Sequence, residues 1–189
     1  MIGVDNCRDY IKSLMNEIYY SQFGRIEKAS KLIEETIADG GDICFFGQGH
    51  SVWIGRDVFG TYDLPIKVIE ENGLNVIELL DSNNIKKEDV LVITSNSGIN
   101  AYIVDLAIEI KKRGNKLIVI NSNKHTLNCK SRHISKTKLY QYGDVVIDNC
   151  CVYGDAAIKD GENDIGSFSS IANNAIVHTI LKKVIKESR

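Results

Sequence analysis

A short polar segment that directly follows an apolar run in this chain could bind an anion. The apolar run is Val90–Ile93, the polar segment is Ser95-Asn96-Ser97-Gly98, and a helical pattern begins at about Asn100. In a strand-loop-helix unit, the first free N–H groups of the helix point over the carboxyl end of the strand, and serine hydroxyls add donors. Gly98 lets an anion approach the backbone and permits a positive φ. These residue types predict a phosphate-binding loop, although an ordinary turn with a serine N-cap has the same composition.

A similar segment occurs earlier in the chain. Residues 42–46 are predicted to form the first core strand, and Gly47-Gln48-Gly49-His50-Ser51 follows it. A dinucleotide fingerprint needs a third glycine, which is not clearly placed, and an acidic residue after a strand, but Glu70 and Glu71 follow no obvious strand of that kind. Ser51 therefore favours a monophosphate over a dinucleotide.

These segments can meet only if strands and helices alternate around them. The hydrophobic patterns predict such an alternation and hence a doubly wound parallel sheet with right-handed crossovers. A third strand, at about Lys116–Ile120, also ends in small polar residues. Because ligands bind such sheets beyond the carboxyl ends of the strands, the serines after these strands should converge on one crevice. They are Ser51, Ser95, Ser97 and Ser122.

The spacing of apolar residues places the remaining elements. Two amphipathic helices precede the first strand, at about residues 6–20 and 24–38, and we expect one of them to pack on another subunit, with Ile11, Leu14 and Ile18 at or near the contact. Other helices are predicted at about residues 52–60, 101–113 and 168–186, and other strands at 75–80 and 144–147. The polar segment 124–138 is too long for a tight connection and is typical of a loop that serves a site.

Composition narrows the possible functions. The 189 residues fit one domain, and a net charge of −2 with scattered lysines disfavours binding to nucleic acid. Five cysteines without a C-x-x-C pair predict reduced thiols, and neither a signal peptide nor a membrane-spanning run is evident. We therefore expect a cytoplasmic protein that does not contact a membrane and that uses no metal or other cofactor.

The glycine and serine motifs, taken together, resemble a sugar isomerase (SIS) domain. They resemble in particular a bacterial SIS family related to phosphoheptose isomerases and muramic acid 6-phosphate etherases. The resemblance covers most of the chain from Asp42 onward and is weakest between Val52 and Asn75. The segments that carry it, in order, are Phe46–Ser51, Ser95–Gly98, His125, Ser131–His133, Lys138–Tyr140 and Asp144–Asn149.

The resemblance implies a three-layer α/β/α sandwich around a five-stranded, parallel, doubly wound (flavodoxin-like) sheet. Residues 1–189 would form a single SIS domain, with a helical N-terminal extension (1–40) in oligomer contact and an α/β core (41–189). It also implies a phosphorylated sugar as ligand and a homodimer or homotetramer with sites at subunit contacts.

The resemblance also implies which residues form the site, by their positions in the matching motifs. The serines Ser51, Ser95, Ser97 and Ser122 would hold the phosphate, and Asn96, Gly98 and Asn100 would shape the loop. Aldose–ketose isomerisation moves a proton between adjacent carbons, so an acid or base must face the sugar. The candidates are His50, His125, His133 and Asp155, whereas His178 is predicted to lie within a helix and to be structural.

Three functions remain open from the sequence. The first is a sugar-phosphate isomerase. The second is a sensor or binding module for sugar phosphates without catalysis, and the third is an enzyme that cleaves an ether or amide bond of an amino-sugar phosphate.

Overall fold

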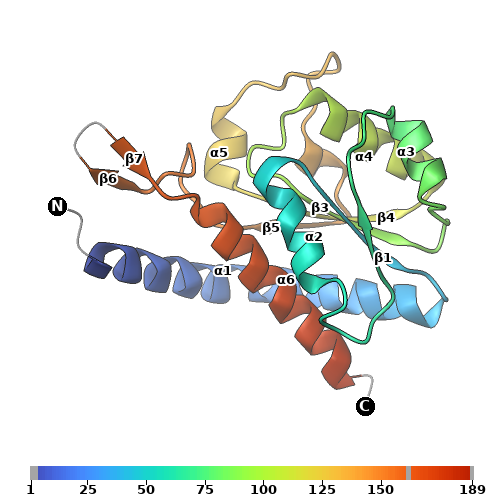
Figure 1. The fold of residues 1–189 in the computed structure, drawn as a ribbon, viewed down its shortest axis with the longest axis horizontal. Helices are drawn as coiled ribbons and strands as arrows, with labels where there is room; N and C mark the ends of the chain where they lie inside the picture. The colour runs from blue at the N-terminus through green and yellow to red at the C-terminus, as the bar shows by residue number, and fades with distance from the viewer. Residues whose placement is uncertain (1–3, 161–162, 188–189) are drawn as a thin grey trace.

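Five parallel strands form the central sheet of the computed structural model, which describes residues 4–160 and 163–187 (Figure 1). Their order is β2-β1-β3-β4-β5, so the direction of winding reverses between β1 and β3. The all-parallel, doubly wound sheet is confirmed. The strands are β1 Ile43–Gly47, β2 Ile66–Ile69, β3 Val90–Thr94, β4 Lys116–Asn121 and β5 Val145–Asp148.

Helices cover both faces of the sheet and make three layers (Figure 1). On one face, α1 (Val4–Ala38), α2 (Val52–Val58) and α6 (Phe168–Glu187) pack on alternate strand residues such as Phe45 and Val92. On the other face, α3 (Val76–Ser82) and α4 (Ala101–Arg113) pack on the intervening residues, such as Phe46 and Ile93. Because both faces are covered, β1 and β3 are buried throughout, which explains their continuous apolar runs.

The register of the sheet brings three strand ends to one level. Gly47 of β1 pairs with Thr94 of β3, and Thr94 pairs with Ile120 of β4. The loops after β1, β3 and β4 therefore begin at the same edge of the sheet, as expected.

The prediction of two N-terminal helices was wrong, because α1 is continuous over 35 residues. Its buried stripe continues without a break from Leu14 and Ile18 to Ile26. A Cβ at Gly24 would meet no atom within 4 Å among the residues described, so packing does not require a glycine there. Leu14 and Ile18 are 3% and 5% exposed and belong to this chain's own core, with Ile11 half-buried beside them, so little of their surface is left for the expected contact with another subunit.

The prediction of a strand at residues 75–80 was also wrong. This segment is helix α3, and Asn75 caps it by accepting from the amides of Ile77 and Glu78, while the Glu78 carboxylate accepts from the amide of Asn75. This capping box fixes a helix where the apolar run alone was ambiguous. The second strand is instead the edge strand β2, so Glu70 and Glu71 do follow a strand, contrary to expectation.

The connection between β5 and α6 contains a hairpin that the sequence did not predict. Its strands are β6 (Ile158–Asp160) and β7 (Asn163–Ile165), paired antiparallel. A short helix, α5 (Asn123–Asn128), begins the segment that was predicted as a loop at 124–138. Within the described ranges, no helix is both long enough and apolar enough to span a bilayer.

Candidate functional site

The loop between β3 and α4 is held by its own backbone and by a neighbouring segment. The amide of Ser95 donates to the carbonyl of Ile120 (3.0 Å), and the amide of Gly98 donates to Ser95 Oγ (3.2 Å). The carbonyl of Gly98 accepts from the amide of Leu139 (2.9 Å). Ser95 Oγ therefore shapes the turn as a local cap does, while its own O–H has no acceptor among the residues described and can still donate.

Open donors remain at the middle of this loop. Within the part of the chain that the structure describes, the amides of Asn96 and Ser97 and the hydroxyl of Ser97 have no hydrogen-bond partner. These donors lie just before the 13-residue helix α4. The N-cap of α4 is Asn100, whose side-chain oxygen accepts from the amide of Tyr102 (3.1 Å). Free N–H and O–H groups at the positive end of a helix favour an anion.

Gly98 is required by the backbone and by packing. Its φ is +60°, and a Cβ there would lie 3.2 Å from Leu139 Cβ. The positive φ that the sequence analysis allowed is confirmed. A side chain at this position would point toward Leu139, however. The glycine therefore makes room for Leu139, and not for an anion as predicted.

The turn after β1 approaches the same edge of the sheet. A Cβ on Gly47 would lie 2.5 Å from the backbone of Ser51, and Thr94 Oγ1 donates to the Ser51 carbonyl (3.4 Å). Ser51 is half-buried, and its hydroxyl has no partner among the residues described. Ser51 and Ser97 therefore provide open hydroxyls on two neighbouring loops, with the exposed His50 beside Ser51.

Ser122 is committed to a structural role. It is completely buried, its hydroxyl donates to the Cys151 carbonyl (2.6 Å), and it accepts from the amide of His125 (3.0 Å) as the N-cap of α5. With the hydroxyl hydrogen used and the group shielded from solvent, the structure favours capping over the phosphate contact predicted for it.

His125 lies against the β3–α4 loop. Its Nδ1 is 3.4 Å from Asn96 Nδ2, and its ring packs against Tyr153 with centroids 4.9 Å apart. Burial lowers the pKa of His125, and the charge of Asp155 opposes that shift. Of the predicted acid–base residues, this one is in direct contact with the phosphate-loop candidate.

His133 and Asp155 hold loops in place. His133 is buried, its Nε2 bonds Asp105 of α4 (2.9 Å), and its Nδ1 accepts from the amide of Ser135 (3.1 Å). Asp155 accepts from the amide and hydroxyl of Ser169 (2.8 and 2.6 Å) and thus ties the loop after β5 to the first turn of α6. Both side chains are occupied by these structural contacts.

Glu70 and Glu71 also have partners in the structure. Glu70 bonds Arg56 Nε (2.7 Å), and Glu71 accepts from Gln48 Nε2 (2.6 Å). Both follow a strand and are exposed, and these contacts engage one oxygen of each carboxylate.

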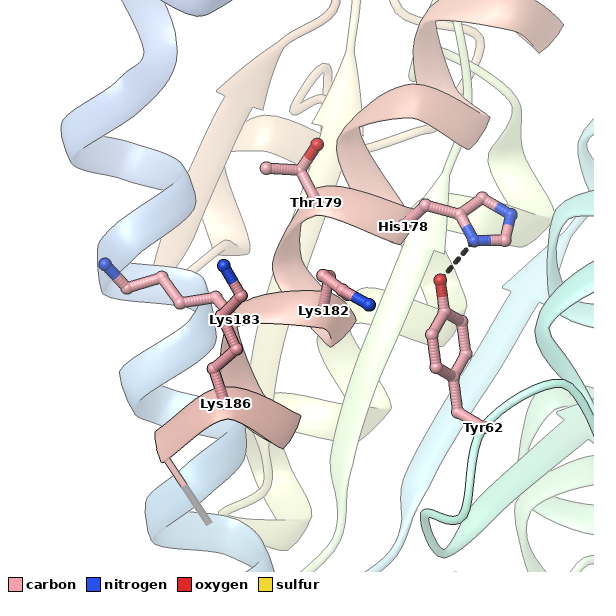
Figure 2. Close-up of a pocket in the computed structure, with 6 residues that line it drawn as sticks. All are labelled: Tyr62, His178, Thr179, Lys182, Lys183 and Lys186. Carbon is pink, nitrogen blue, oxygen red and sulfur yellow. Dashed lines mark hydrogen bonds between the residues drawn. The ribbon is translucent and has the colours of Figure 1, made fainter. Parts of the chain in front are cut away.

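A cluster that the sequence analysis missed lies along the C-terminal half of α6. His178 Nδ1 bonds the Tyr62 hydroxyl (2.5 Å; Figure 2), and His178 Nε2 bonds Asp57 (2.7 Å). His178 is more than 100 positions from both Tyr62 and Asp57 in the chain, so no local sequence pattern predicts this cluster. The adjoining cavity of about 640 Å³ is lined by Tyr62, His178, Thr179, Lys182, Lys183 and Lys186.

This cavity is separate from the strand ends. Its lysines project from the last turns of α6, and Lys183 pairs with Glu27 of α1, whereas the loop after β5 contacts the first turn of α6. The cavity and the β3–α4 loop therefore do not form one site within a single chain.

The sheet and its loops define an α/β protein whose open polar groups lie at the switch point between β1 and β3, where such folds bind ligands. The chain belongs to the SIS domain family, whose model matches residues 7–63 and 64–122.

Relatives in sequence and structure agree with this assignment. The chain is 31% identical over 203 residues to the UPF0309 protein BH3325 of Halalkalibacterium halodurans, covering 97% of this chain and 83% of that protein. Its fold matches the phosphoheptose isomerase GmhA from Neisseria gonorrhoeae with a TM-score of 0.68 over 97% of each chain, at 12% identity. It also matches the sugar isomerase domain of an RpiR transcription factor from Sphaerobacter thermophilus, with a TM-score of 0.65 and 16% identity, over 97% of this chain and 87% of that domain.

Proposed function

We propose that the protein binds a phosphorylated sugar at the carboxyl ends of β1 and β3 and interconverts its aldose and ketose forms. The observation that carries this proposal is the set of donors on Asn96 and Ser97 that have no partner among the residues described, on the loop beside the one that carries the Ser51 hydroxyl. Membership of the SIS family supports a sugar phosphate over another anion.

Turnover is tested with a panel of aldose and ketose phosphates that also contains an amino-sugar 6-phosphate and a muramic acid 6-phosphate. NMR follows the carbon that gains or loses a proton, and isomerisation of one member is the expected result. Cleavage of an ether or amide bond instead of isomerisation would show that the third function is correct.

A sensor without catalysis is the second candidate, because the structure commits two of the four predicted acid–base residues, His133 and Asp155, to structural contacts. This candidate predicts saturable binding of a sugar phosphate with no turnover of any member of the panel. The match to the sugar isomerase domain of a transcription factor is in keeping with it.

Replacing Ser97 with alanine tests the loop itself. The change should weaken binding by about 10- to 150-fold, because a hydrogen bond to a charged phosphate contributes about 1.5–3 kcal/mol. Calorimetric titration with the turned-over sugar phosphate measures the affinity, and denaturant unfolding should show little loss of stability.

Ser122→Ala is the matched control for Ser97→Ala. This serine caps α5, and its buried hydroxyl donates to the Cys151 carbonyl, so its loss should cost about 1–3 kcal/mol of unfolding free energy and lower the affinity far less than Ser97→Ala does. If Ser97→Ala lowers stability and spares affinity, as a cap would, the phosphate-loop assignment is incorrect.

The protein assembles as a homo-oligomer in this proposal, through a face other than the one expected from sequence. Tyr19, Tyr20 and Phe23 of α1 are 62%, 81% and 48% exposed and lie close together, with the Tyr19 ring 5.3 Å from Tyr20 and 5.9 Å from Phe23. Light scattering should give a multiple of the chain mass, and Tyr20→Glu should shift it toward the monomer. A monomeric mass for the unmodified protein at micromolar concentration would contradict the assembly.

A further inference from the structure

A buried chain of side-chain amides connects the end of β5 to His125. It begins at Asn149, which is fully buried and accepts from the amide of Cys151 through Oδ1 (3.0 Å). Because a backbone N–H can only donate, the atom facing it must be the oxygen. The orientation of the Asn149 amide is thereby fixed.

The nitrogen of Asn149 then fixes the next residue in the chain. Its two hydrogens are directed to Asn96 Oδ1 (3.1 Å) and Asn173 Oδ1 (2.9 Å). With its oxygen turned toward Asn149, Asn96 presents Nδ2 to Nδ1 of His125 at 3.4 Å. An amide nitrogen has no acceptor capacity, so Nδ1 must be the acceptor and cannot carry a hydrogen.

The remaining ring nitrogen is therefore the protonated one. Nε2 of His125 has no hydrogen-bond partner within the described part of the chain. The ring is packed against Tyr153 and half-buried, and the ionised group that acts on it from the loop after β5 is Asp155. Burial outweighs this charge and lowers the pKa of His125, so the neutral form prevails near pH 7.

We infer that Asn149 and Asn96 hold His125 as the neutral Nε2–H tautomer, and that this N–H donates a hydrogen bond to an oxygen of the ligand bound at the β3–α4 loop. His125 is then a ligand-binding donor, and the general base for isomerisation is another group, because the basic nitrogen of His125 is occupied by Asn96. Asn149 is a positioning residue that acts through Asn96. The donor role rests on the proposed function, whereas the tautomer does not.

The tautomer is measured on the unliganded protein by long-range ¹H–¹⁵N NMR at a pH where the ring is neutral. The His125 signal is identified by its loss in His125→Gln. We expect the pattern of a protonated Nε2 and an unprotonated Nδ1. The opposite pattern, or an equal mixture of tautomers, would overturn the inference.

Two aspartate variants separate hydrogen-bond direction from charge. In Asn96→Asp, one oxygen still accepts from Asn149 and the other faces His125, so Nδ1 should gain a proton and the tautomer should reverse or the ring should become charged. In Asn173→Asp, the oxygen that accepts from Asn149 is kept, so the tautomer should stay as in the unmodified protein. The same change in both variants, or in neither, would contradict the relay. If Asn96→Asp fails to fold, the measurement on the unmodified protein still decides the tautomer.

A ligand titration separates this inference from the proposed function. Adding the sugar-phosphate panel should shift the Nε2 resonance of His125 with the same saturation curve as binding measured by calorimetry. Saturable binding that leaves Nε2 unchanged overturns the donor role and leaves the proposed function standing. If no member of the panel binds, the proposed function and the donor role both fail, while the tautomer stands on the unliganded spectrum.

Discussion

Replacing Gly98 with valine should lower the free energy of unfolding by roughly 4 kcal/mol and abolish ligand binding. About half of that loss comes from forcing a β-branched residue into φ +60°, and the rest comes from a Cβ that would lie 3.2 Å from Leu139 Cβ. To avoid this close contact, either the β3–α4 loop or Leu139 must move, and the hydrogen bond from the Leu139 amide to the Gly98 carbonyl would be disturbed. The open donors of Asn96 and Ser97 would move with the loop.

Gly73→Val is the control for backbone strain alone. Gly73 has φ +81°, but a Cβ there would meet no atom within 4 Å among the residues described. Denaturant unfolding should therefore show a loss of only about 2 kcal/mol. Equal losses in the two valine variants would mean that the Leu139 contact does not constrain the loop.

The second large effect is expected at Asp155. Its replacement with alanine should lower the free energy of unfolding by about 3 kcal/mol, because the carboxylate caps α6 through Ser169 and also accepts from the Ser167 hydroxyl (2.7 Å). Alanine also tolerates the observed φ of +70° less well than aspartate does. Thermal or denaturant unfolding measures the loss.

Asp155→Asn distinguishes capping from catalysis. Asparagine keeps an acceptor for the Ser169 amide and tolerates a positive φ, so it should lose roughly half as much stability as alanine does. A catalytic carboxylate would give a different result, with turnover lost equally in both variants and stability little changed. That outcome would restore Asp155 to the role predicted from the sequence.

Local patterns predicted much of the fold, because their causes are local. The β3–α4 unit and the end of α4 at Gly114, with φ +83°, depend on neighbouring residues and were predicted correctly. The α3 segment was not, since its apolar run suits a strand or a helix, although the Asn75 and Glu78 capping box three residues apart was a readable signal. Two helices were predicted at about residues 6–20 and 24–38, but the buried stripe continues between them and α1 is one helix.

The candidate site was less predictable, because its distinctions depend on distant parts of the chain. Ser97 and Ser122 both follow buried strands, and only the contacts of the folded chain distinguish them. Ser122 is buried, donates to the Cys151 carbonyl and caps α5. Likewise, His178 hydrogen-bonds Asp57 of α2, and Asn96 hydrogen-bonds Asn149 after β5. The two residues of each pair are more than 50 positions apart in the chain. Residue type and spacing along the chain do not encode such contacts.

The central claim is that the β3–α4 loop holds the phosphate, and backbone-amide NMR tests it most directly. The protein is titrated with inorganic phosphate and then with the sugar-phosphate panel while the amide signals are followed residue by residue. The amides of Asn96 and Ser97 should show the largest saturable shifts, and Ser97→Ala should raise the ligand concentration needed for half-saturation by about 10- to 150-fold. Shifts concentrated at Lys182 and Lys186 beside the α6 cavity, with the loop amides unmoved, would contradict the claim.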